Sequence, residues 1–225
     1  MVISGRTHLR RANLIGAKLQ GVDFQEANLQ LANLEGADLR GANLKKADLR
    51  GANLSDTHLL DGKGANLQEA NLQEANLQGA SLVKTNLEQV NLEGANLQLA
   101  NLHLANLKGA NTKKANFQVA NLQGANLQGT NLEEADLYGA DLKEANLQEA
   151  NLRGTNLYGA DLHKANLLRA NLEEVNLEEA DLTGVHNLSI DQLSKVKKLY
   201  NAKLGEEILI PLKEKYPALF RGPGE

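Results

Sequence analysis

Large apolar side chains recur at every fifth residue through most of this chain. Between residues 88 and 109, leucine stands at 92, 97, 102 and 107, and a small residue precedes each leucine by two places. A five-residue period matches neither the 3.6-residue α-helix nor the two-residue alternation of a β-strand. The pattern therefore predicts a chain that turns a corner every five residues, which is a solenoid.

The chemistry of each five-residue unit assigns its positions to the inside or the outside. The central leucine and the small residue two places earlier lie on the same side of the pleat, and we expect both to point inward. The other three positions are polar and are expected to face solvent. Glycine is common at the last of them, as at Gly79, Gly124 and Gly139, which fits a turn with one positive-φ residue. Units with Glu or Lys at that position are expected to use another turn type.

The extent of the period defines the domain organisation. The repeat keeps its phase to Asp61, is interrupted by Gly62, Lys63 and Gly64, and resumes in phase at Ala65. The interruption is interpreted as a tolerated surface insertion at one corner, with a binding loop as the alternative. We divide the chain into a lead-in at 1–6, the repeat domain at 7–184 with a loop at 62–64, and a C-terminal helical cap and tail at 185–225.

Helix signals appear where the period ends. Ser189 and Gln192 have the spacing of a capping box, which predicts a helix from there to about Tyr200. A second, short helix is predicted near Leu212–Tyr216, with Pro211 opening or kinking it. These helices are expected to cover the open end of the last coil. The N-terminal end lacks such a segment, so we expect a partner or a second copy to cover it.

The tandem A-(D/N)-L-x-x units over 7–184 resemble the pentapeptide-repeat family, and the helical tail resembles that of its cyanobacterial members. The resemblance implies an all-β solenoid: a right-handed quadrilateral parallel β-helix of about nine coils, with four units per coil and a short C-terminal α-helical cap. Besides the interruption, the sequence departs from the family pattern at Lys18, His58, Ser81 and Thr112.

A coil of 20 residues would stack side chains that are 20 positions apart, about 4.8 Å from one another. One such column alternates in sign, and we expect its members to form ion pairs along the rod. Its members are Glu93, Lys113, Glu133, Arg153 and Glu173.

A second column is acidic, with Asp141, Asp161 and Asp181 stacked. Like charges at that spacing should raise the pKa of one another or recruit a cation, and Lys143 and Lys164 are near enough to offset part of the repulsion. The alternative is that these are solvated repeat residues without a partner.

Apolar side chains at outward positions form a further candidate site. Such groups in a patch indicate a contact with another protein, with local packing or sequence drift as the alternative. The predicted patch covers one face and its adjoining corner, and consists of Leu99, Leu104, Val119, Tyr138 and Tyr158.

Composition excludes several classes of function. With no Cys and five dispersed His, the chain offers no metal-binding or catalytic constellation, so we expect no enzyme activity, no cofactor and no metal. The net charge is −4, and 12 acidic against 4 basic side chains give residues 131–184 a local charge of −8. A nucleic-acid ligand is therefore not expected. Neither a membrane helix nor a secretory signal is predicted, so a cytoplasmic location is expected.

These features favour a non-catalytic structural or protein-interaction scaffold of bacterial origin, whose protein partner the sequence does not identify. We expect a monomer, or a dimer through the uncapped N-terminal coil. The alternative comes from the resemblance: some family members mimic DNA and bind DNA gyrase. The acidic third of this chain motivates a similar binder of a gyrase-type enzyme.

Overall fold

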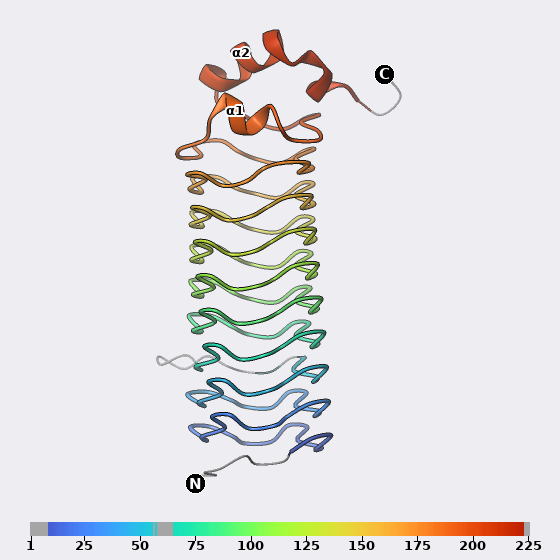
Figure 1. The fold of residues 1–225 in the computed structure, drawn as a ribbon, viewed down its shortest axis with the longest axis vertical. Helices are drawn as coiled ribbons and strands as arrows, with labels where there is room; N and C mark the ends of the chain where they lie inside the picture. Colours follow the sequence, from blue (N-terminus) through green and yellow to red (C-terminus); the bar gives the residue numbers. More distant parts are fainter. Residues whose placement is uncertain (1–8, 56, 58–64, 223–225) are drawn as a thin grey trace.

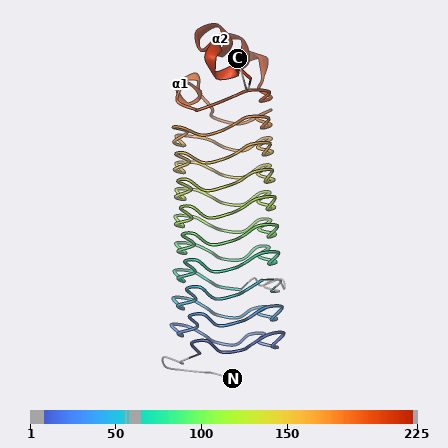
Figure 2. The same ribbon diagram turned by 90° about the vertical axis from the view of Figure 1, so that its right-hand side faces the viewer.

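The computed structural model describes residues 9–55, 57 and 65–222, and it is a straight rod of stacked coils (Figure 1 and Figure 2). Parallel β-bridges join residues 20 apart, as in the series Asn91, Asn111 and Asn131. The bridging positions recur every five residues along the chain. Each coil of 20 residues therefore has four sides, and the predicted 20-residue register is confirmed for the described residues.

The register shifts once. Asn43 pairs with Asn66 and Asn53 pairs with Asn76, so these partners are 23 residues apart instead of 20. The predicted loop at 62–64 lies outside the described residues. The coils on either side of it nevertheless pair in phase, with three additional residues in the intervening coil.

The core is a narrow column of leucine and alanine. The central leucines and the small residues before them are almost completely buried, which confirms the inward assignment of both positions. Thr112 stands where leucine is usual and is also fully buried. Its hydroxyl donates to the carbonyl of Asn131 at 2.9 Å, so the polar group within the core is hydrogen-bonded.

Glycine and non-glycine units turn the corner in the same way. Gly94 has a φ of +67°, and Leu99 in the next unit has a φ of +60°. The turn closes with a hydrogen bond from the Ala100 amide to the Leu97 carbonyl at 3.0 Å, as in a type II turn. The expectation of another turn type for Glu or Lys was therefore wrong. Each fifth-position amide also donates to the coil above, as from Leu99 to Gln118 at 3.0 Å, and this bond helps offset the cost of a positive φ.

The first helix of the tail is shorter than predicted. The capping box of Ser189 and Gln192 is present, but helix α1 spans only Ile190–Leu193. The prediction of helix to Tyr200 was wrong, because the chain after α1 rejoins the solenoid. Lys198 forms a parallel bridge with Asn176 there.

The second helix is longer than predicted. Helix α2 spans Glu206–Lys215, with Pro211 in its interior, and the 3₁₀ helix η1 follows at Pro217–Phe220. A helix confined to Leu212–Tyr216 was therefore wrong. The missing Pro211 amide costs the helix only one interior hydrogen bond. Both α-helices lie over the C-terminal end of the rod (Figure 1).

Candidate functional site

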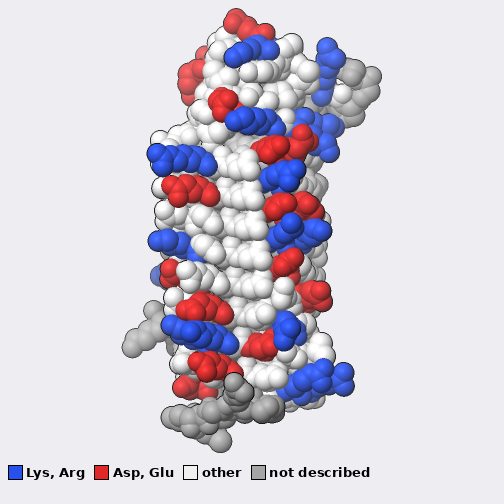
Figure 3. All heavy atoms as spheres, viewed as in Figure 1, with Lys and Arg blue, Asp and Glu red and all other residues white. Residues whose placement is uncertain are grey.

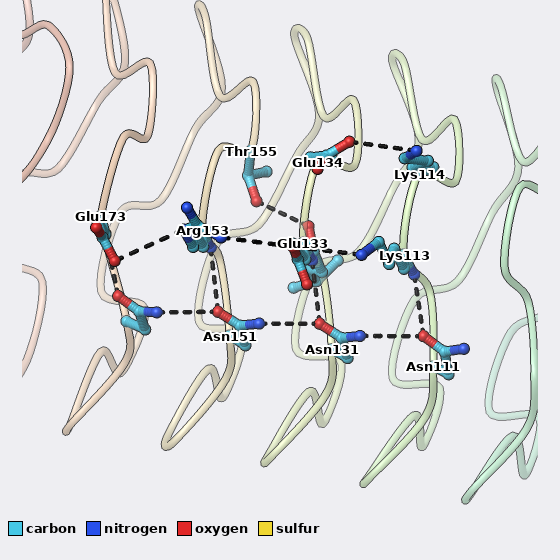
Figure 4. Close-up of polar contacts among 12 residues, drawn as sticks. Asn111, Lys113, Lys114, Asn131, Glu133, Glu134, Asn151, Arg153, Thr155 and Glu173 are labelled. Atoms are coloured by element: carbon cyan, nitrogen blue, oxygen red, sulfur yellow. Dashed lines mark hydrogen bonds and ion pairs between the residues drawn. The ribbon is translucent and has the colours of Figure 1, made fainter.

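Asparagine ladders run along the sides of the rod. The Asn131 side chain donates to Asn111 Oδ1 at 3.2 Å and accepts from Asn151 Nδ2 at 3.1 Å, and its oxygen also accepts from the Glu133 amide at 3.3 Å (Figure 4). The sequence reading assigned these positions simply to solvent and missed the ladders. The signal was the recurrence of Asn at 20-residue spacing.

The predicted column of alternating charges forms ion pairs over most of its length. Lys113 lies 3.3 Å from Glu133, and Arg153 lies 3.8 Å from Glu133 and 3.6 Å from Glu173 (Figure 4). Glu93 instead accepts a hydrogen bond from Gln73 at 3.3 Å. On the face shown in Figure 3, basic and acidic side chains likewise gather in two columns, with an uncharged strip between them.

The predicted acidic ladder of Asp141, Asp161 and Asp181 is stacked, and lysines neutralise it. Lys143 lies 3.3 Å from Asp141 and 2.9 Å from Asp161, and hydrogen bonds to Asp161 and Asp141 raise the pKa of Lys143. Lys203 lies 3.2 Å from Asp181. Among the described residues, Lys143 and Lys203 provide this pairing.

The expected rise in pKa is wrong for Asp181. Burial opposes its ionisation, but hydrogen bonds from the Thr183 hydroxyl and amide, together with the Lys203 ammonium, outweigh that effect and lower its pKa. Within the described part of the chain, no three His, Asp or Glu side chains come close enough to hold a metal ion. The acidic ladder is therefore a set of ion pairs.

Four of the five predicted patch residues lie at one corner, which we call the apolar corner: Leu99, Val119, Tyr138 and Tyr158. Backbone hydrogen bonds stack their units, from Leu99 to Gln118 and from Val119 to Tyr138. Leu99 is 57% exposed, Val119 52% and Tyr138 47%. Leu104 is 46% exposed but lies at the next corner along the chain, over Gly124.

The two tyrosines form the aromatic part of the apolar corner. The rings of Tyr138 and Tyr158 stack with centroids 5.4 Å apart and planes 8° from parallel. The Tyr158 hydroxyl donates a hydrogen bond to the Glu179 carboxylate, which raises the pKa of Tyr158 to about 12. The rings thereby hold a fixed position at the surface.

Two glycines lie beside the tyrosines and were missed by the sequence reading as part of the patch. Gly139 and Gly159 occupy the same turn position as Leu99 and Val119, one and two coils further along. A Cβ on Gly159 would meet nothing within 4 Å, and one on Gly139 would meet only a Val119 methyl at 3.9 Å. The column thus changes from protruding side chains to open space.

The chain belongs to the pentapeptide-repeat family. The model of the family, described as pentapeptide repeats, matches eight copies at residues 5–30, 18–56, 63–98, 100–137, 135–173 and 150–186. Proteins of this family are generally non-catalytic.

Solved structures of the same family are similar to this chain. HetL, involved in the regulation of heterocyst differentiation in the cyanobacterium Nostoc sp. strain PCC 7120, is 32% identical, over 81% of this chain and 90% of HetL, with a TM-score of 0.43. QnrB1, a plasmid-mediated fluoroquinolone resistance protein, is 19% identical, over 90% of this chain and 93% of QnrB1, with a TM-score of 0.53, which shows a shared fold. No curated protein matches the sequence. In the part of the chain that the structure describes, no helix is long and apolar enough to cross a membrane.

Proposed function

We propose that this protein is a non-catalytic scaffold that binds another protein through the apolar corner. The observation that carries the proposal is the exposure of Leu99, Val119 and Tyr138 on consecutive coils, at turn positions that are polar or glycine in most other units. Apolar groups gathered on a surface favour removal from water by a partner. The rigid ladder of the rod holds them in a fixed arrangement, so little side-chain freedom remains to be lost on binding.

A photo-crosslinking residue at Val119, introduced in the intact chain and expressed in the native host, tests the proposal. The matched control places the same residue at Lys114, which occupies the same turn position at another corner with a φ of +58°. An adduct of defined composition at Val119, absent at Lys114, supports the proposal. That adduct should disappear when Leu99→Gln and Tyr138→Gln are added. Equal labelling at both positions, or none at Val119, refutes the proposal.

Mimicry of DNA is the alternative, and the local charge of −8 between residues 131 and 184 is its motive. A DNA mimic needs carboxylates that are free to meet the basic groups of an enzyme. Lys143 already pairs with two aspartates of the acidic ladder, and Arg153 with two glutamates of the charged column. We therefore expect that stoichiometric protein leaves DNA gyrase supercoiling unchanged. Inhibition that is lost on substitution of the acidic ladder would favour the alternative.

A further inference from the structure

The fifth-position column of the apolar corner has an ordered sequence of sizes. Leu99 and Val119 protrude on two successive coils, and we call them the ridge. Gly139 and Gly159 follow on the next two coils, and we call them the trough. Ridge and trough therefore have equal lengths and lie end to end along one line.

We propose that the partner of the apolar corner is a second copy of this chain, lying antiparallel with the ridge of each copy in the trough of the other. The two-fold axis is perpendicular to both rods and passes between the levels of Val119 and Gly139. It places Val119 opposite Gly139 of the second copy and Leu99 opposite Gly159 of the second copy. A self-complementary surface of this kind is what an isologous dimer requires. This inference rests on the proposed function, because it fills the same corner.

The tyrosines fit the antiparallel arrangement. Tyr138 faces Gln118 of the second copy and Tyr158 faces Gln98 of the second copy, because the axis keeps the fourth positions of the two copies on the same side. Within one chain the two rings cover each other and hold their edges outward. Ring edges carry partial positive charge, which suits the amide oxygen of glutamine.

The charges at the end of the contact also favour this direction. Glu179 follows the trough and faces Gly79 of the second copy, so no carboxylate meets another. A parallel dimer would instead place Glu179 against Glu179, Leu99 against Leu99, and the two troughs against each other. Like charges at that separation repel, and facing glycines would leave an unfilled gap.

The size of the contact predicts its strength. Ridge and trough together span four coils, about 15 Å between the first and the last. Two convex corners of that length bury less than the roughly 1,600 Å² of a standard stable interface. We therefore expect a reversible dimer whose population rises with concentration.

Sedimentation equilibrium of the full chain over a range of concentrations tests the contact. Wild type should be a reversible dimer, and Gly159→Gln, which fills the trough, should weaken dimerisation by at least about tenfold. The turn tolerates glutamine, since Gln89 has a φ of +55° at the same position. Gly129→Gln is the matched control: a Cβ there also meets nothing within 4 Å, and Gly129 lies at the opposite corner. The control should dimerise like wild type. A monomeric wild type, or undiminished dimerisation of Gly159→Gln, overturns the proposal.

Disulfide trapping tests the direction, because the chain has no cysteine of its own. An equimolar mixture of Val119→Cys and Gly139→Cys should cross-link faster than either variant alone. Faster cross-linking of Val119→Cys with itself indicates a parallel dimer and overturns the antiparallel one. The failure of this inference is distinct from failure of the proposed function: with a monomeric wild type, a Val119 adduct to a different protein would still support the scaffold. The absence of every Val119 adduct would refute the scaffold itself.

Discussion

At the scale of single residues, Asn131 shows how one amide stabilises three consecutive coils. It donates to Asn111, accepts from Asn151 and accepts from the Glu133 amide. Asn131→Ala removes all three bonds and leaves half-buried partners unsatisfied, so we expect a loss of about 1–3 kcal/mol in unfolding free energy. Chemical denaturation followed by circular dichroism measures it. Gln128→Ala, which removes a side chain at a nearby corner, is the control; equal losses in both variants would contradict a special role of the ladder.

Tyr158 gives a second prediction at this scale. Its pKa of about 12 lies above the ordinary 10 because the hydroxyl donates to Glu179, so folding favours the neutral form. The stabilisation is complete below pH 10 and is lost as the pH rises through about 12. Glu179→Gln should return the titration of Tyr158 toward 10, measured by ultraviolet difference absorbance. Glu174→Gln, at the same turn position of another corner, should leave the titration unchanged; an unshifted Tyr158 in Glu179→Gln would rule out the Glu179 carboxylate as the cause of the raised pKa.

At the scale of elements, Gln192 fastens α1 to the last coils. Its amide donates to the carbonyls of Leu167 at 2.8 Å and Ala170 at 3.1 Å, while its oxygen accepts from the Ser189 amide at 3.0 Å. Gln192→Glu keeps the oxygen of the capping box but loses both donors, so we expect faster amide exchange at Leu193 and the last coil.

The control for that experiment separates capping from attachment. Ser189→Ala removes the side-chain acceptor for the Gln192 amide but leaves the two bonds to the coil. It should cost about 1 kcal/mol of helix stability while the last coil keeps its protection. Exchange in the last coil that rises equally in both variants would show that α1, and not the Gln192 amide, protects it.

How far the tail could be predicted follows from the same element. The capping box was predicted from Ser189 and Gln192 because it is a local signal, and α1 begins there. The end of α1 was not, because an apolar spacing that suits a helix through Tyr200 also suits a chain that rejoins a coil. The bridge from Asn176 to Lys198 decides between them, and that contact is with a different coil.

At the scale of the whole molecule, the repeat itself made most of the fold predictable. The five-residue period specified the inward Leu and Ala positions, and stepping by 20 found the pairing of Lys113 with Glu133. The trough was missed because Gly139 and Gly159 look like ordinary turn glycines. Their importance comes from the ridge on the preceding coils, and it becomes visible only when the whole column is considered.

The register of the rod leads to a last prediction. Partners on either side of the interruption are 23 residues apart, while those beyond it are 20 apart, so three residues are surplus to the coil repeat. Deleting Gly62, Lys63 and Gly64 joins Asp61 to Ala65 in phase, and we expect the same fold with an unchanged or higher melting temperature. A shorter connection costs slightly less loop-closure entropy, and two glycines no longer have to be ordered on folding.

A deletion of equal length inside a repeat unit is the control. Removing residues 91–93 takes away the buried Leu92 and shifts every later unit against the coil before it. Loss of a buried leucine alone costs about 2–5 kcal/mol, so this variant should melt well below wild type by circular dichroism. If the deletion of 62–64 lowers the melting temperature by a similar amount, those three residues contribute contacts that the 23-residue spacing does not reveal. If only the control is destabilised, continuity of the five-residue phase is what the rod requires.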